Sequence, residues 1–436
     1  MTEGPTQRIA VIGSGISGLS AAWLLSKRHR VTIFEAEDRI GGHSHTVDAL
    51  GVPVDTGFIV YNERTYPNLT ALFDHLEVPT KPSAMSFSVS IDDGRLEYAG
   101  SLKGLFAQPR NVASPRFWSM LKDLAHFYHR APRDLAAVGD LSLGDYLDGI
   151  GCGPAFRDDH LYPMAAAIWS TPVHRIPDYP AAAFIRFCVN HGLLKFLRRP
   201  IWRTVDGGSR EYVKRLLADF DGDVRTGCPV RWIRRDDDKV VIGHDGGGES
   251  FDQVVIAAHA NRALAMLADA DADEAATLGA FQYRANQAIL HSDPALMPQR
   301  RGVWSSWNYA SQPGDGTPQL SVTYWMNRLQ GIAEDKPLFL TLNPSAEPDP
   351  AMVYARIDWD HPMFDAGAVA AQKRLWALQG HRRTWLCGAY FGAGFHEDGL
   401  QAGLAVAEAL GGGKRPWQVA GESARIHLPA EALTAA

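Results

Sequence analysis

The sequence predicts an α/β protein in which a nucleotide-binding part with a parallel sheet is interrupted by an α+β part. Three observations lead to this fold class. A glycine-rich turn joins a short apolar strand to a helix near the N-terminus, in "RIAVIGSGISGLSAAWLLSKRHR". An apolar strand, "QVVIAA", returns in the middle of the chain. A second glycine-rich loop precedes an alanine-rich helix in "GAYFGAGFHEDGLQAGLAVAEAL". Strands that alternate with helices in this way are typical of parallel sheets.

The first glycine-rich turn has the spacing of a dinucleotide fingerprint. Arg8–Ile12 is a short apolar run of strand type, and apolar residues then recur at helical spacing from Ser17 to Lys27. Between them Gly13, Gly15 and Gly18 form G-x-G-x-x-G, which combines a tight turn, room for a pyrophosphate and close helix–strand packing. The helix N-terminus offers free N–H groups to phosphates. The loop residues expected beside the phosphates are Ser14, Ile16 and Ser17.

A second strand, Val31–Phe34, ends at Glu35, 20 residues after Gly15. A carboxylate at this place accepts hydrogen bonds from ribose hydroxyls, so it favours an unphosphorylated ribose and NADP is not expected. We expect Ala36 to lie beside the same nucleotide. Strand, motif, helix, strand and acid together predict a Rossmann-type unit; the alternative is a βαβ unit that binds no ligand.

The residues after Glu35 bear on the choice between NAD and FAD. "EAEDRIGGH" places Arg39 before Gly41 and Gly42. It resembles the E-x-x-x-R-x-G-G signature of the flavin amine oxidase and phytoene desaturase superfamily. The resemblance implies that the paired glycines bring a second loop to the FAD pyrophosphate and that the arginine supports this loop. His43 stands where amine oxidases usually have a second arginine, which is a departure from their pattern.

The stretch "VDTGFIVYNERTYPNL" lies where the same superfamily brings backbone to the flavin ring. Thr56 and Gly57 are the residues that the resemblance proposes for this contact. Asp55 is either a functional acid or a turn residue, and the sequence favours neither.

The glycine-rich loop near the C-terminus is consistent with FAD. FAD is long, and its ring carries negative charge at N1 and O2 when reduced, which a second helix N-terminus would stabilise. Gly388–Gly394 and His396–Gly399, followed by a helix over Leu400–Leu410, resemble the C-terminal flavin motif of the superfamily. Gly388, His396, Glu397 and Asp398 are therefore candidate cofactor residues. The alternative is that the two acids only cap the helix.

A middle segment is expected to return to the nucleotide-binding part. "WRTVDGGSREYVKRLLADF" predicts a turn and an amphipathic helix, and strands follow up to Val254–Ala258. The resemblance implies that Val230 contacts the adenine through its backbone. The predicted FAD-binding domain thus combines residues 1–84, 200–262 and 384–412. The substrate domain has a helical part, 85–199, and a sheet part, 263–383. Residues 413–436 are expected to be a tail, loose after about Ala420.

The two inserts differ in pattern. In the first, Ser114 before Pro115 predicts a helix start, and Ser142 with Asp145 predicts a capping box. In the second, "QAILHSD", "RGVWSSWNYA", "QLSVTYWMNRLQ" and "PLFLTLNP" predict sheet strands that could form the floor of a substrate cavity. The candidate lining residues, each of which could instead be plain core, are Trp169, Trp304, Trp307, Tyr324 and Asn327.

Composition restricts the partners. The chain has 436 residues, 46% of them hydrophobic and 21% charged, as in ordinary globular proteins. A net charge of −6 argues against general nucleic-acid binding. The four cysteines are not spaced as metal ligands, so we expect no metal site. We find no signal peptide pattern and expect a cytoplasmic protein. "LLKFLRRP", from Leu193 on, is either a patch that contacts the inner membrane transiently or a core helix with a basic edge.

Almost the whole chain, about residues 8 to 412, resembles one branch of the superfamily, the bacterial predicted NAD/FAD-binding proteins described as FAD-dependent oxidoreductases. That group is often associated with enzymes resembling cyclopropane-fatty-acyl-phospholipid synthases. The resemblance therefore implies an apolar substrate, a modified or unsaturated fatty acyl chain, with hydride moving to or from flavin N5. His291 and His396 are the catalytic candidates.

Three other functions stay open at this point. Amine oxidases commonly place a lysine near flavin N5, but "FQYRANQAILHSD" contains Arg284 and His291 and no lysine, which disfavours an amine oxidase. A non-redox isomerase that uses FAD is a second alternative. A binding module that keeps FAD as a structural element is a third.

Overall fold

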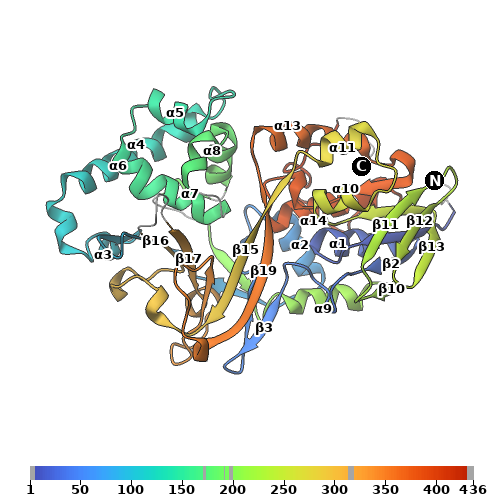
Figure 1. The fold of residues 1–436 in the computed structure, drawn as a ribbon, viewed down its shortest axis with the longest axis horizontal. Helices are drawn as coiled ribbons and strands as arrows, with labels where there is room; N and C mark the ends of the chain where they lie inside the picture. Colours follow the sequence, from blue (N-terminus) through green and yellow to red (C-terminus); the bar gives the residue numbers. More distant parts are fainter. Residues whose placement is uncertain (1–4, 170–172, 191, 196–199, 313–318, 430–436) are drawn as a thin grey trace.

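The computed structural model describes residues 5–169, 173–190, 192–195, 200–312 and 319–429. It has two lobes, which are joined by segments that cross between them several times (Figure 1). The lobe at the right of Figure 1 contains the N-terminal βαβ unit and the last long helix. The other lobe contains a twisted sheet and a group of helices. No helix among the described residues is both long and apolar enough to cross a bilayer.

A parallel sheet of five strands forms the centre of the first lobe, as predicted. Its spatial order is β10-β2-β1-β14-β20, and every neighbouring pair is parallel. β1 and β2 are buried from their second residues onward, as expected for a sheet covered on both faces. The strands are β1 Arg8–Ile12, β2 Arg30–Phe34, β10 Gly222–Arg225, β14 Gln253–Ile256 and β20 Thr384–Leu386.

Two helices from opposite ends of the chain lie side by side on this sheet. They are α1, Ile16–Leu25, and α14, His396–Ala409. Contact is close, because a Cβ built on Gly403 would lie 2.2 Å from the Ser17 carbonyl oxygen, and one on Gly399 would lie 3.0 Å from Ile16 Cγ2. Early residues of one helix therefore meet early residues of the other. The two helices run parallel, with both N-termini at the same edge of the sheet.

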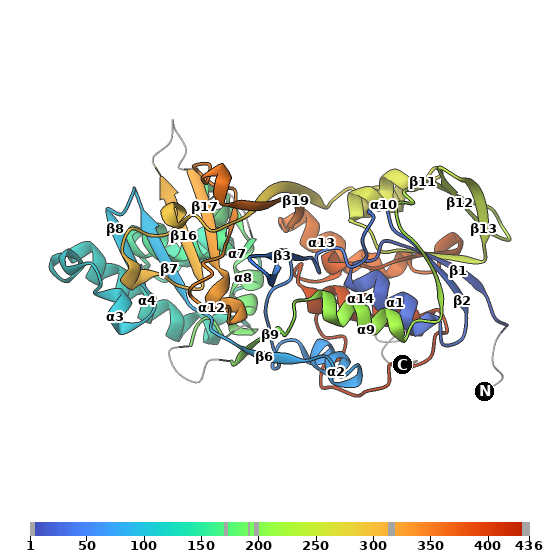
Figure 2. The same ribbon diagram turned by 90° about the horizontal axis from the view of Figure 1, so that it is seen from below.

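Smaller elements surround this core. A three-stranded antiparallel sheet, β11-β12-β13, lies at the outer side of the lobe (Figure 1). α9, Arg210–Ala218, and α2, Pro67–His75, lie near α1 and α14 (Figure 2). The remaining bounds are β3 Thr46–Ala49, β4 Val52–Asp55, β5 Tyr61–Asn62, β6 Thr80–Ser83, β9 Trp202–Val205, β11 Val230–Arg235, β12 Val240–His244 and β13 Gly247–Phe251.

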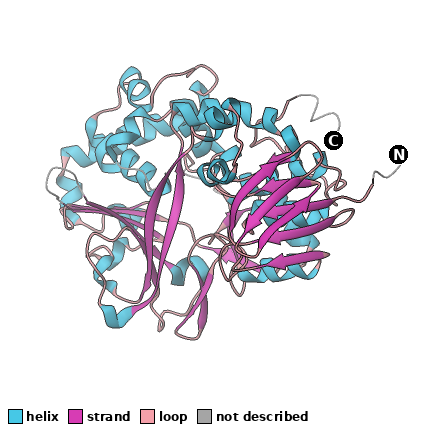
Figure 3. Cartoon of the chain, turned by 45° about the vertical axis from the view of Figure 1, so that its right-hand side comes forward, coloured by secondary structure: helices cyan, strands magenta, loops and turns pink. Residues whose placement is uncertain are grey.

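The second lobe is built on a seven-stranded sheet with the order β19-β15-β18-β17-β16-β7-β8. Figure 3 shows it as a separate layer from the parallel sheet. The second insert is strand-rich as predicted. The first insert was expected to be helical, yet it also supplies β7 and β8. The strands are β7 Phe87–Ile91, β8 Leu96–Ala99, β15 Gln282–His291, β16 Trp307–Gln312, β17 Gln319–Trp325, β18 Phe339–Leu342 and β19 Val353–Met363.

Helices of the first insert cover one end of this sheet (Figure 1). Two predicted helix starts are confirmed: the Ser114 hydroxyl accepts a hydrogen bond from Phe117 N, and the Ser142 hydroxyl accepts one from Asp145 N. The helices are α3 Leu102–Leu105, α4 Pro115–Asp134, α5 Leu143–Gly149, α6 Pro154–Phe156, α7 Tyr162–Trp169 and α8 Ala181–Asn190.

The boundary predicted at residue 263 falls inside a helix. α10, Ala260–Met266, continues from β14, and Ala268 N donates to the Ile233 carbonyl in the three-stranded sheet. α10, α11 and α13 lie on the side of the first lobe in Figure 1. α11 spans Ala272–Leu278, α12 Met326–Gln330 and α13 Ala366–Leu375.

The expectation of a loose tail is wrong for the residues up to Pro429. Arg415 is buried and pairs with Glu408 of α14. Arg425 pairs with buried Asp398, and Ile426 is buried in the core. The composition of the tail hid these contacts, because each depends on a partner elsewhere in the chain.

Candidate functional site

The N-terminus of α1 is open. No side chain caps it, and a Cβ built on Gly15 would have no atom within 4 Å. The first N–H groups of a helix lack intrahelical partners, and they carry the positive end of the helix dipole. Gly13 and Ser14 hold the turn before the helix, where Gly13 N donates to the Phe34 carbonyl. This arrangement fits a pyrophosphate.

A second loop lies directly against this turn. A Cβ on Gly42 would come within 2.9 Å of Gly15 Cα, and Gly42 has a φ of +55°. Gly41 N donates to the Ser14 carbonyl, while Arg39 Nη1 donates to the Gly42 carbonyl at 2.7 Å. Arg39 thus supports the paired-glycine loop, which is the role the resemblance implies for it.

The two glycine loops together form a cradle, and Glu35 lies at the end of this cradle that is next to β11. Its Oε2 accepts from Ser14 N at 2.9 Å, and its Oε1 accepts from Glu37 N at 3.0 Å. Cys228 N donates to the Glu35 carbonyl, so the turn into β11 and Val230 runs beside Glu35. Ala36 is exposed next to it. The residues predicted for the ribose and the adenine are therefore neighbours in space.

The second helix N-terminus, that of α14, carries His396 as its first residue. The helix begins four residues earlier than predicted, because Asp398 Oδ2 accepts from Phe395 N at 2.8 Å and caps the start. The His396 ring stacks on Phe58 at 3.9 Å between centroids. Its Nε2 lies 2.7 Å from the Tyr212 hydroxyl, which also contacts Ser44 Oγ.

A group of histidines lies at the same edge of the sheet. His43 stacks on Trp359 of β19 with centroids 4.4 Å apart. The His43 ring is 6.2 Å from His259 and 5.9 Å from His361, and His259 stacks on Tyr283 of β15. All are largely enclosed by protein, and each keeps part of its surface accessible to the space around it. We call His43, His259, His361 and His396 the histidine group.

Enclosure keeps the histidine group uncharged. Burial lowers the pKa of His396 to about 3 and that of His361 to about 4. Burial lowers the pKa of His43 well below its ordinary value, and the neighbouring histidines and Arg39 lower it further. Burial also lowers the pKa of His259, against the opposing effect of Asp360. At neutral pH these rings are neutral, and each has one nitrogen that donates and one that accepts.

Glu397 and Asp398 do not point into this space. Glu397 is fully buried; its Oε1 accepts from Asn68 N and its Oε2 from Leu69 N, which caps the start of α2. Asp398 binds Phe395 N and Arg425. These contacts agree with the alternative prediction, in which the two acids only cap helices.

The segment with Thr56 and Gly57 runs beside His43. Phe58 N donates to the His43 carbonyl, and the Thr56 hydroxyl lies 2.7 Å from His45 Nδ1. Trp359 Nε1 donates to the Thr56 carbonyl at 3.0 Å. The backbone at these two residues therefore lies at the histidine group; its contact with the flavin ring stays a prediction. Gly388, at the end of β20, lies two residues before the ring of Tyr390 and is buried.

Asp55 has a structural environment. It accepts from the Thr46 hydroxyl, from Ser209 N and from Gln330 Nε2, at 2.6 to 2.9 Å. Burial raises its pKa to about 6 against these hydrogen bonds. Asp55 thus joins three segments behind the site.

His291 does not lie with His396. It ends β15, whereas Tyr283, which contacts the histidine group, lies near the start of the same strand. Eight residues of strand span roughly 26 Å. His291 Nε2 contacts the Thr341 hydroxyl at 2.7 Å, and its ring lies against Phe339. Burial lowers its pKa to about 4. These contacts describe a core histidine.

The candidate lining residues also divide. Trp304 packs against Trp325 and Phe339, in the cluster of His291. Asn327 binds backbone groups of the loop that follows it, including the Ala333 carbonyl and Leu338 N. Trp307 and Tyr324 form an edge-to-face pair, with Tyr324 in the core under the helices. Trp169 ends α7, but its side chain lies outside the described part of the chain.

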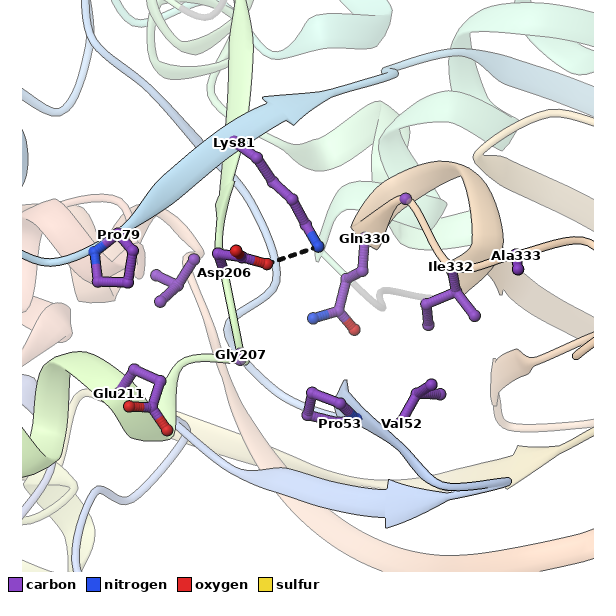
Figure 4. A pocket seen from close by; sticks show the side chains of 13 residues that line it. Val52, Pro53, Pro79, Lys81, Asp206, Gly207, Glu211, Gln330, Ile332 and Ala333 are labelled. Atoms are coloured by element: carbon purple, nitrogen blue, oxygen red, sulfur yellow. Dashed lines mark ion pairs between the residues drawn. The ribbon is translucent and has the colours of Figure 1, made fainter.

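A surface pocket of about 510 Å³ lies behind the site (Figure 4). Its wall includes Gln330, whose amide binds Asp55, and an ion pair of 2.8 Å between Lys81 and Asp206. None of the predicted cofactor residues lines it. We therefore place the cofactor at the converging helix N-termini and not in this pocket.

Several residues at the site were not predicted. Tyr212 lies in the amphipathic helix predicted after Gly208, and Phe58 follows Gly57. His259 follows β14, and side chains beyond the carboxyl ends of parallel strands are usual ligand contacts, so this signal was present. In "DWDHPM" strand alternation puts Trp359 and His361 on one face. Their facing partners could be found only from the fold.

Comparison with known proteins agrees with this geometry. The family model for flavin-containing amine oxidoreductases matches residues 16–411. A putative flavin-containing monoamine oxidase of Mycobacterium tuberculosis is 23% identical over 81% of this chain and 74% of that protein. A carotenoid phi-ring synthase of Streptomyces griseus is 31% identical over 37% of this chain and 33% of that protein.

Solved structures share the fold. Putrescine oxidase bound to putrescine has a TM-score of 0.67 at 15% identity, and covers 93% of this chain and 99% of its own. A CLA-producing fatty acid isomerase from P. acnes has a TM-score of 0.66 at 17% identity, with 93% and 98% covered. The family model, which spans most of the chain, and the cradle formed by the two glycine loops lead to one conclusion: the chain belongs to the flavin-containing amine oxidoreductase family and is an FAD-dependent oxidoreductase.

Proposed function

We propose that the enzyme transfers hydride between an apolar substrate, a modified or unsaturated fatty acyl chain, and FAD. When bound, FAD supplies the hydride acceptor or donor at N5. The chain would hold the cofactor through the N-termini of α1 and α14 and exclude water around the reacting carbon.

The observation that carries this proposal is the neutral character of the histidine group. Its rings are uncharged at neutral pH and stack on aromatic or histidine neighbours, such as Phe58 and Trp359. The nearby acids Glu397 and Asp398 are turned away and fully bonded. An apolar chain loses no strong solvation on entering such a space, whereas an ammonium ion would need a compensating charge.

Strand β15, which reaches the histidine group through Tyr283, also favours an apolar substrate over an amine. β15 carries Arg284 and no lysine. The lysine common in amine oxidases is therefore missing from this strand. Arg284 is exposed and follows Tyr283, so it lies on the face of β15 opposite to the histidine group. Among proteins of the same fold, the isomerase from P. acnes is named for a fatty acid product and putrescine oxidase for a diamine. The fold is thus compatible with either substrate class.

His396 is the residue we propose for proton transfer. Its Nε2 contacts the Tyr212 hydroxyl, which can donate or accept according to the tautomer of the ring. The other nitrogen can then accept or donate a proton at the substrate. The start of α14 would stabilise negative charge near the same point.

The test is an anaerobic visible spectrum of the flavin-loaded protein, titrated with purified acyl lipid classes. The flavin bands should bleach with an acyl lipid. In the variant His396→Gln bleaching should slow by about 100-fold with FAD still bound, as for loss of a general acid or base. His291→Gln is the matched control and should bleach at the rate of the unmodified protein.

Two outcomes favour other functions. Bleaching by amines, with none by lipids, would mean an amine oxidase. Because one structural neighbour is an isomerase, the products should also be weighed by mass spectrometry after chemical reduction of the flavin. A product of unchanged mass would identify double-bond isomerisation instead of net oxidation.

A further inference from the structure

α3 and α4 lie in the helical part, away from the first lobe (Figures 1 and 2). Exposed apolar side chains gather around α3 and the start of α4. Leu102 is 79% exposed, Val112 54% and Trp118 48%, with Phe106 at 36%. The rings of Phe106 and Trp118 are 6.0 Å apart, and Trp118 Nε1 donates to the Val112 carbonyl at 2.8 Å. We call these four side chains the α3–α4 patch. Contiguous exposed apolar groups of this kind mark interaction sites.

Positive charge borders the patch. From Tyr98 to Lys122 the chain has four basic residues and no acid, although the whole protein has a net charge of −6. Arg116 pairs with Asp159 and also lies 3.7 Å from Asp158, so it adds no net positive charge to the patch. Lys103 and Lys122 are exposed and form no salt bridge within the described residues. Arg110 is exposed too and donates to the Gly94 carbonyl.

The lysine and aromatic side chains of this region lie close enough in the fold to contact one membrane surface together. Lys122 follows Trp118 by one helical turn on α4, so these two side chains share a face of the helix. Lys103 belongs to the same short helix, α3, as Leu102. Tryptophan suits the boundary between headgroups and acyl chains, and each lysine near an anionic bilayer adds attraction. We infer that the α3–α4 patch docks the enzyme on a bilayer of anionic phospholipid. This site differs from the segment around Leu193, and the inference does not depend on the flavin chemistry.

The test uses flotation of the flavin-loaded full chain with vesicles of phosphatidylglycerol and phosphatidylcholine, compared with phosphatidylcholine alone. Binding should require phosphatidylglycerol and weaken at high salt. Lys103→Gln with Lys122→Gln should weaken partition by about 30-fold, since each lysine contributes about a factor of five to six. Trp118→Ser should weaken it by about tenfold.

Matched controls lie in the other lobe. Trp232 is 39% exposed on β11, and Lys239 is exposed in the turn between β11 and β12. Trp232→Ser, and Lys239→Gln with Lys414→Gln, should bind vesicles like the unmodified protein. Thermal midpoints of all variants check that they are folded.

Three results would overturn the inference. One is equal binding to both vesicle types, and another is unchanged binding by the α3–α4 variants. The third is a dimer in light scattering that Trp118→Ser converts to a monomer, which would make the patch a contact between copies of the chain.

Discussion

The two glycine-rich loops that precede α1 and α14 look alike in sequence but have different tasks. The loop before α1 leaves an open helix N-terminus, with empty space over Gly15. The loop before α14 is fastened by Asp398, which accepts from Phe395 N just before the helix, and we call it the closed loop. Its helix presents a histidine ring as the first residue. Bare backbone suits a phosphate, whereas a capped helix with an aromatic first residue suits a ring system. Glycine content alone therefore does not identify a phosphate site, because the contacts at the helix N-terminus decide what can bind there.

The largest expected effect is at the closed loop. Asp398→Ala removes the cap of α14 and leaves Arg425 buried without its partner. Loss of one member of a buried ion pair costs about 3–5 kcal/mol of unfolding free energy. Urea denaturation would measure it. If the two residues act together, Asp398→Ala with Arg425→Met should cost less than the sum of the single changes.

A substitution in the loop before α1, the open loop, should change the affinity for FAD and not the stability of the fold. Gly15→Val fills the space over α1 and should weaken FAD binding by about 100-fold, near 2.7 kcal/mol. Titration of the apoprotein with FAD gives the dissociation constant. Gly149→Val is the control, because a Cβ there also meets no atom within 4 Å. Tight FAD binding by Gly15→Val would remove α1 from the cofactor site.

A smaller effect is expected for the other acid of the closed loop. Glu397→Gln replaces one accepting oxygen at the start of α2 and should destabilise the protein by about 1–2 kcal/mol. FAD affinity should not change, since Glu397 faces α2. A loss of affinity at unchanged stability would return Glu397 to the cofactor site.

The pH dependence sharpens the same comparison. The pKa of His396 is lowered to about 3, so the folded state holds the neutral ring and the unfolded state takes up a proton below pH 6.5. Its contribution to stability is present above pH 6.5 and is lost as pH falls toward 3. In His396→Gln the slope of unfolding free energy against pH should fall by up to about 1.4 kcal/mol per pH unit between pH 4 and 6. An unchanged slope there would mean that His396 is protonated in the folded protein.

The parallel sheet and its first helix could be predicted because their signals are local. Apolar runs, glycine spacing and the acid after β2 lie within about thirty residues. The same is true of the helix starts at Ser114 and Ser142. The strands β7 and β8 were missed because they join a sheet whose other members come 200 residues later. The packed segment around Arg425 was missed for the same reason.

The site was predictable in its backbone but less so in its side chains. Gly42 meets Gly15, and the turn that leads to Val230 lies beside Glu35, so the residues predicted for one nucleotide are neighbours. The sequence shows that Glu397 and Asp398 are acids but not where their side chains point. Their roles therefore depend on the positions of α2 and Arg425, which only the fold shows. His291 has the right chemistry for catalysis, but only the length of β15 shows its distance from His396.

The pairing of α1 with α14 has a consequence for how the protein folds during its synthesis. The first helix made by the ribosome finds its neighbour only when almost the entire chain has emerged, and Arg425 must follow to close the end. Contacts that are so distant in sequence form late and slowly. The nascent nucleotide lobe therefore stays open during synthesis, and FAD can be enclosed only at the end, which makes the supply of cofactor at chain release a condition for high yield.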